Sequence, residues 1–109
     1  MILLTCDEVP GRRVERVIGL VRGNTVRSRH VGRDVAAWLK NLVGGEIEEY
    51  TKLLAEAREQ ALDRMIAEAR ARGADAILGM RFATSEIAAG ASEFMAYGTA
   101  VKLAPEEPT

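Results

Sequence analysis

The chain has 109 residues, a formal net charge of −1 and 48% hydrophobic residues, which suits one domain with a single core. The short apolar start, residues 1–4, is too brief for a signal peptide, and no segment reaches the roughly 20 apolar residues that cross a bilayer. A single cysteine, Cys6, excludes an intrachain disulfide and a multi-cysteine metal knuckle within one subunit. We therefore expect a cytoplasmic protein with no membrane partner.

Basic residues are concentrated in one part of the chain. Residues 11–40 hold eight arginines and lysines against two acidic residues, Glu15 and Asp34. This asymmetry fits an anionic partner, or a basic face of one subunit that meets an acidic face of the next. Nucleic-acid-binding surfaces usually interleave aromatic side chains that stack on bases, and this stretch has only Trp38. The pattern favours self-association or a solvated surface over nucleic acid.

The first part of the chain predicts a turn and then a strand. Val9-Pro10-Gly11 favours a turn, because proline presets its backbone angle and glycine accepts the positive angle that follows. Side chains from residue 14 to residue 22 alternate with the period of a strand. Gly23-Asn24 then predicts a bend or a bulge, after which residues 25–29 could continue the strand.

Two helices should follow. Apolar residues recur at three- and four-residue spacing over residues 31–43, which predicts a short amphipathic helix that Gly44-Gly45 ends or kinks. A second helix should cover residues 46–72, with glutamates in its first turn, arginines in its last and Gly73 as its C-terminal cap. It would be about 40 Å long, against a diameter of roughly 26 Å for a compact domain of this size. Part of this helix should therefore need a partner subunit.

Two strands should close the domain, over residues 76–84 and 93–103, joined by a hairpin at 88–92. Both faces of each strand are largely apolar, and since a helix covers one face of a small sheet, the other face needs a second chain. Connection rules place the last strand between the other two. We predict a two-layer α+β fold, β-α-β-β, with one long helix on a three-stranded sheet of order 1-3-2. Residues 1–103 should form this domain and residues 104–109 a disordered tail.

Five segments carry a resemblance to a known family. They are Gly19-Leu20-Val21-Arg22-Gly23-Asn24-Thr25-Val26, Arg33-Asp34, Val43-Gly44-Gly45-Glu46, Gly73-Ala74-Asp75-Ala76 and Tyr97-Gly98-Thr99-Ala100-Val101. In order and spacing the chain resembles, over nearly its whole length, the YbjQ-like family of small prokaryotic proteins, labelled as heavy-metal-binding and of unknown function. The resemblance implies a dodecin-like subunit in a ring-shaped homopentamer. It implies no ligand motif that transfers residue by residue.

Candidate metal ligands are few, because soft metals prefer thiolate and imidazole and the chain has one cysteine and one histidine. His30 and Asp34 are the best local pair, about one helical turn apart if the helix begins by Gly32. A ring of subunits could complete such a site with ligands from neighbours. The alternative is a surface imidazole beside a capping aspartate.

Charged residues at helix starts are the other candidates for ligand binding. Arg33 and Asp34 begin an otherwise apolar helix, where Asp34 could cap free amides and Arg33 could pair across a subunit boundary, or both could face a ligand. Glu46 and Glu49 follow the glycine pair and could line a cleft or simply match the helix dipole. Buried ion pairs are expected at two charges in apolar strands, Asp75 and Arg81.

The sequence holds no nucleophile with a base and an orienting group, so we expect no enzyme. We predict a homo-oligomer, a pentamer by the resemblance, that acts as a binding module. Its inter-subunit sites would hold a metal ion or a small ligand; the cofactor stays open, with a divalent or heavy-metal ion as the candidate. Two alternatives remain: a scaffold that docks a macromolecular partner through the basic 12–33 segment, and an enzyme whose site is assembled between chains.

Overall fold

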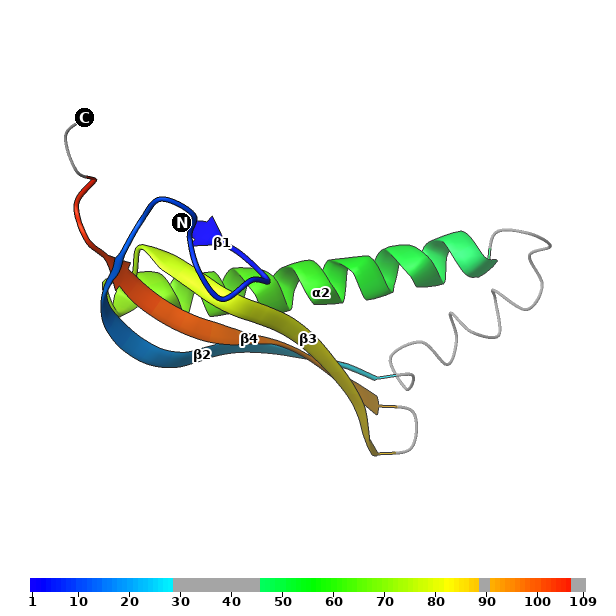
Figure 1. The fold of residues 1–109 in the computed structure, drawn as a ribbon. Coiled ribbons are helices and arrows are strands. Elements are labelled where there is room, and N and C mark those ends of the chain that lie inside the picture. The colour runs from blue at the N-terminus through cyan, green and yellow to red at the C-terminus, as the bar shows by residue number, and fades with distance from the viewer. Residues whose placement is uncertain (29–45, 89–90, 107–109) are drawn as a thin grey trace.

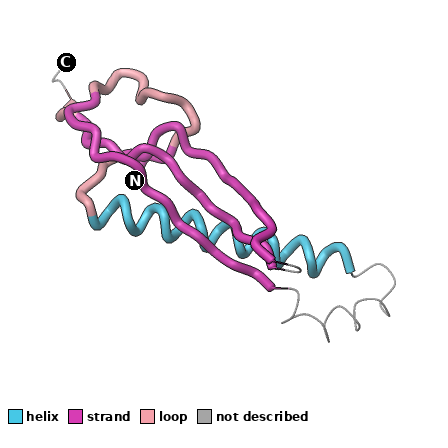
Figure 2. Tube along the Cα trace, turned by 90° about the horizontal axis from the view of Figure 1, so that it is seen from below, coloured by secondary structure: helices cyan, strands magenta, loops and turns pink. Residues whose placement is uncertain are grey.

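The computed structural model describes residues 1–28, 46–88 and 91–106, with side chains other than those of residues 28 and 46–51. Its elements are β1 (Ile2–Leu3), β2 (Val14–Ser28), α2 (Glu46–Ala71), β3 (Ala76–Ala88) and β4 (Ala91–Leu103). The strands form one sheet in the order β1-β3-β4-β2, and α2 lies along one face of it (Figures 1 and 2). The chain is therefore an α+β protein of two layers.

The sheet has four strands, so the expectation of three was wrong. Ile2 and Leu3 pair in parallel with Ala76 and Ile77. The N-terminal segment stays bonded to β3 beyond this pair, because Met80 N donates to Leu4 O over 3.0 Å and Gly79 N to Cys6 O over 2.9 Å. A strand of two residues has no alternation for a pattern to detect. β4 lies between β2 and β3 and is antiparallel to both.

The long strands extend further than the sequence indicated. β2 runs through Gly23-Asn24 up to Ser28, β3 ends at Ala88 and β4 begins at Ala91. The bend or bulge predicted at Gly23-Asn24 is absent, and the register shifts of β2 lie between Val14 and Arg16 and between Val17 and Gly19. Gly23 lies under α2, where a Cβ atom would come within 2.1 Å of Ala61 O and 2.4 Å of Met65 N. The glycine is therefore explained by the close approach of the helix backbone to the strand.

The predicted turn and helix end are both confirmed. Arg12 N donates to Val9 O over 3.0 Å, and Gly11 has a φ of 77°. At the end of α2, Gly73 N donates to Arg70 O and Ala74 N to Ala69 O, each over 3.0 Å, with a φ of 79° at Gly73. This is the Schellman arrangement that a glycine cap predicts. The helix expected over residues 31–43 and the Gly44-Gly45 break lie outside the described residues.

The core lies mainly between α2 and the sheet. The helix buries a stripe of Ala57, Ala61, Met65 and Ala69, all at 0% exposure. On the opposite face of the sheet a smaller cluster packs under the N-terminal segment: Ala76, Leu78, Val101 and Leu103, with Ile2, Leu4, Val9 and Val14 against them. No helix in the part of the chain that the structure describes has the length and apolar character to cross a membrane.

The packed structure includes the first residue beyond β4. Ala104 is buried, its N donates to Arg13 O over 2.8 Å, and its O accepts from Arg12 Nη2 over 3.0 Å. Arg12 Nη1 also lies 3.9 Å from Glu106 Oε1. Of the segment expected to be a disordered tail, residues 107–109 lie outside the described residues.

Side chains from one flank of α2 bind the outer edge of β2. Gln60, Arg64, Glu68 and Arg72 follow one another at four-residue spacing and so share a flank of the helix. Arg72 donates from Nη1 to Leu20 O over 2.9 Å and from Nη2 to Ile18 O over 3.1 Å. Glu68 Oε2 accepts from Arg22 N over 3.0 Å, and Arg64 Nη1 donates to Asn24 O. These contacts occupy backbone groups that an edge strand would otherwise offer to another chain.

An acidic residue joins the start of β3 to the end of β4. Asp75 Oδ2 accepts from Leu103 N over 2.9 Å and lies 3.6 Å from Lys102 Nζ. The hydrogen bond from Leu103, with the positive charge of Lys102, lowers the pKa of Asp75 below its ordinary value against the opposing effect of desolvation. The side chains of Lys102 and Asp75 are 44% and 40% exposed, so this ion pair is not buried within the single chain. Arg81 donates to Thr5 O and Met80 O.

Replacing Gly23 tests how closely the helix approaches β2. Gly23→Ala should lower the free energy of unfolding by about 1–3 kcal/mol, because the added methyl group pushes α2 from the strand. Without such a clash, alanine should raise the free energy of unfolding by about 0.4–1 kcal/mol, because it reduces the conformational entropy of the unfolded chain. Urea unfolding at a fixed protein concentration measures the difference, and a variant as stable as wild type would contradict the close approach.

Replacing Arg72 tests the contacts at the edge of β2. Arg72→Met keeps a long side chain but leaves Ile18 O and Leu20 O without its guanidinium, so the free energy of unfolding should fall by about 1–2 kcal/mol. Arg70→Met is the matched control, because Arg70 is an exposed arginine in the same last turn of α2. Equal losses in the two variants would assign the effect to charge at the helix end.

Replacing Asp75 tests its contribution to acid stability. Because its pKa is lower in the folded state, Asp75 should stabilise the fold above its unfolded pKa of about 3.9, and this contribution should be lost as the pH falls through the folded value. Asp75→Asn should therefore be less stable than wild type at neutral pH, with the gap closing in acid. Urea unfolding across pH 2–7 measures this. Asp63→Asn, which removes a surface carboxylate of α2, is the control. If the two variants show the same dependence of stability on pH, the effect comes from net charge and not from the contacts of Asp75.

Candidate functional site

The charged residues singled out by the sequence are not brought together by the described part of the structure. His30, Arg33 and Asp34 lie outside the described residues. Glu46 and Glu49 lie in the first turn of α2, and their side chains are likewise not described. Within residues 1–28, 46–88 and 91–106, no three histidine, cysteine, aspartate or glutamate side chains gather as a metal site would require.

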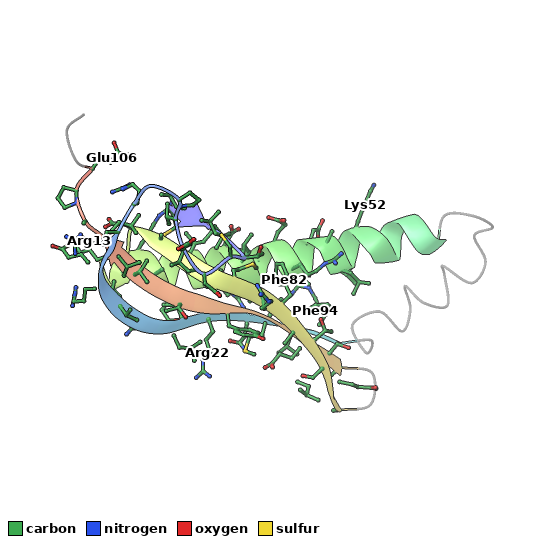
Figure 3. The ribbon with its side chains drawn as sticks, viewed as in Figure 1. Arg13, Arg22, Lys52, Phe82, Phe94 and Glu106 are labelled. Carbon is green, nitrogen blue, oxygen red and sulfur yellow. The ribbon has the colours of Figure 1, made fainter. Side chains whose placement is uncertain are left out.

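The basic 12–33 segment is partly engaged within its own chain. Arg12 binds Ala104 O, and Arg27 Nη2 donates to Gln60 Oε1 over 3.1 Å. Arg22 is exposed and points away from α2 (Figure 3), and Arg13 lies at the end of the molecule near the chain termini. Of the described arginines of this segment, Arg12 and Arg27 are therefore engaged within the chain, whereas Arg13, Arg16 and Arg22 are exposed.

The face of the sheet away from α2 exposes large apolar side chains. Val17, Leu20 and Val26 are 63%, 59% and 50% exposed. Leu20 lies opposite Thr99 in the register of β2 and β4, and Asn24 lies opposite Met95. Since alternate residues of a strand share a face, Leu20 and Val26 lie on one side with Met95 and Tyr97. We call this surface the open face. The sequence anticipated only the part of this face on β4, both of whose faces read as apolar; it did not anticipate that Val17 and Leu20 share a face, because a register shift lies between Val17 and Gly19.

A pocket lies where the open face meets the N-terminal segment. Its volume is about 310 Å³, and its lining residues are Asp7, Val14, Val17, Leu78, Gly79, Thr99 and Val101. Asp7 comes close to the sheet because Gly79 N donates to Cys6 O over 2.9 Å. Of these lining residues only Asp7 is ionisable.

Sequence reasoning missed Asp7 because nothing in its neighbourhood signals a site. Its place depends on the edge pairing of residues 2–6 with β3, which brings together segments more than 70 residues apart. The neighbouring thiol of Cys6 is exposed and donates to Glu8 O over 3.2 Å. A cluster of Val9, Pro10 and Gly11 could have indicated that the N-terminal segment turns back, but not onto which strand.

Known proteins similar to this chain share its whole length. Residues 1–104 match the sequence profile of the YbjQ family, described as "Putative heavy-metal-binding". A UPF0145 protein of Methanoculleus marisnigri is 59% identical over 98% of this chain and 100% of its own length, and one of Archaeoglobus fulgidus is 57% identical over 94% and 95%. A crystal structure of a DUF74-family protein of unknown function from Pediococcus pentosaceus has the same fold, with a TM-score of 0.62 at 16% identity over 95% of this chain and 98% of that one. The chain therefore belongs to the YbjQ family of UPF0145 proteins.

Proposed function

We propose that this protein is a self-associating, non-enzymatic binding module whose sites for a metal ion or a small ligand lie between subunits. The observation that carries the proposal is the open face. Burying side chains such as Val17, Leu20 and Val26 stabilises a contact by about 25 cal/mol for each Å² of apolar surface removed from water. Large apolar side chains exposed on one face are typical of interaction sites.

The shape of the chain supports association. Its radius of gyration is 18.2 Å, whereas a compact domain of 109 residues has about 13 Å. The long strands and α2 run side by side along the molecule (Figure 1). Other copies could cover apolar side chains that this elongated arrangement leaves exposed. By resemblance to its family, the expected assembly is a pentamer.

The family description supports a heavy-metal ion as one ligand class. With one cysteine and one histidine per chain, a soft-metal site would collect His30 with Asp34, or the thiol of Cys6, from more than one subunit. A small anionic ligand would instead use Arg33, and a hard cation would use Glu46 and Glu49. The scaffold alternative has less support, because Arg12 and Arg27 of the basic segment are engaged within the chain.

Native mass spectrometry of protein purified without a metal-affinity tag tests the proposal. The expected result is a pentamer of 11.9 kDa chains that takes up a stoichiometric number of metal ions when titrated with transition metals. His30→Ala should lose this uptake and keep the pentamer, since the proposed site uses the histidine as a metal ligand.

Cys6→Ser is the control that separates the two soft ligands. Loss of uptake in Cys6→Ser but not in His30→Ala would move the site to the N-terminal segment. A wild-type pentamer that shows no added mass and no heat of binding with any metal would reject metal binding. A monomer at working concentration would reject self-association.

A further inference from the structure

We infer that the open face binds a phosphate group between Arg22 of β2 and Arg81 of β3, over Tyr97 of β4. The inference deepens the proposed binding of a small ligand, because it assigns a chemical class and three residues to one site. All three residues come from a single chain, and none of them is among the charged candidates near the helix starts.

The three side chains form one row across the sheet. Tyr97 lies opposite Arg22 in the register of β4 with β2, and opposite Arg81 in the register of β4 with β3. Residues directly opposite each other on neighbouring strands share a face of the sheet. Because neighbouring strands lie about 4.8 Å apart, the Cα atoms of the two arginines are separated by about 10 Å. Two long guanidinium side chains can close on one anion across this span.

The neighbours of these residues along each strand confirm the face. Val21, Ala96 and Met80 precede Arg22, Tyr97 and Arg81, and all three are buried in the core cluster that packs under α2. Since successive side chains of a strand point to opposite faces, the row lies on the face away from the helix. Arg22 is drawn on that side of the sheet in Figure 3.

Arg81 is held in place by its own chain and keeps donors free. Its Nη1 donates to Thr5 O and to Met80 O, each over 2.8 Å. Arginine has five N–H donors, and within the described residues its Nη2 and Nε make no hydrogen bond. A guanidinium that is already fixed through one nitrogen loses less conformational freedom when it binds an anion through the others.

Neither arginine of the row is neutralised within the described part of the chain. The hydrogen bond between Arg22 and Glu68 uses the backbone N of Arg22, not its guanidinium. No carboxylate oxygen of the described residues lies within 4.0 Å of either guanidinium. The acidic residue opposite Val26, Glu93, lies four residues from Tyr97 along β4, which is about 13 Å.

Two positive charges without partners are costly on a face that another copy covers. The exposed side chains around them are apolar, with Leu20 at 59% and Val26 at 50% exposure. A guanidinium that loses its water needs a counter-charge. This step rests on the proposed self-association, and a bound anion supplies the counter-charge for both arginines.

Charge and geometry favour phosphate over carboxylate as that anion. A phosphate ester carries about −1.5 to −2 charges at pH 7 and three strong acceptor oxygens, which suits two guanidiniums that each donate two parallel hydrogen bonds. A single carboxylate would neutralise only one of them. Tyr97 offers its hydroxyl to inorganic phosphate, or its ring to the aromatic group of a phosphate ester.

Isothermal titration calorimetry tests the inference, with inorganic phosphate and adenosine monophosphate as separate probes at an ionic strength held constant with chloride. Wild type should bind, and Arg22→Gln and Arg81→Gln should each weaken binding about tenfold or more, because each removes charge-assisted hydrogen bonds. Tighter binding of the nucleotide, lost in Tyr97→Leu, would assign the site to aromatic phosphate esters. Equal binding of the two probes would assign it to the phosphate group alone.

Arg70→Gln is the matched control, because Arg70 is an exposed arginine of α2, in the other layer. Equal weakening in Arg70→Gln would show attraction by net charge only and overturn the inference. Since Arg81 also binds Thr5 O, Arg22→Gln decides the result if Arg81→Gln unfolds, as checked by circular dichroism.

Native mass spectrometry separates this inference from the proposed function. A wild-type oligomer that binds neither probe would overturn the phosphate site and leave self-association standing. If Arg22→Gln and Arg81→Gln also lost that oligomer, the arginines would pair with carboxylates of a neighbouring copy. A monomer that binds phosphate would keep the site and reject self-association.

Discussion

The close contact between α2 and β2 at Gly23 is the constraint on which the rest of this structure depends. A side chain at that position would meet the helix backbone at Ala61 O and Met65 N. Small buried residues on the helix, Ala57 and Ala61 among them, let the two backbones approach. Because the helix is held against an edge strand, it cannot also cover β3 at the other side of the sheet.

This placement divides the surface of the molecule into closed and open parts. At β2, the side chains of Glu68 and Arg72 occupy the outward backbone groups, which prevents strand addition there. At β3, the N-terminal segment closes the edge only up to Met80. The apolar side chains left exposed, Leu20 and Phe82 among them, lie on two different sides of the sheet.

The candidate site shows how far local sequence could lead. The two apolar faces of the β4 sequence indicated a face of the sheet that the helix leaves uncovered, because side chains alternate along a regular strand. In β2 the register shift between Val17 and Gly19 breaks this alternation. Alternation could not reveal the pocket beside Asp7, whose walls come from β2, β3, β4 and the N-terminal segment. Chemistry and position near helix starts single out the charged candidates His30, Arg33, Asp34, Glu46 and Glu49. Neither property shows which of these side chains lie close together in the fold.

Local physical chemistry in the sequence was enough to determine α2 and the presence of the three long strands. The cap at Gly73, the turn at Gly11 and the buried stripe that includes Met65 follow from backbone angles and helical period, which neighbouring residues control. Only the tertiary structure decided that residues 2–3 form a fourth strand, that Gly23 lies inside a strand, and that α2 lies towards β2. Each of these depends on contacts between distant segments, and such contacts leave no periodic signal in the chain.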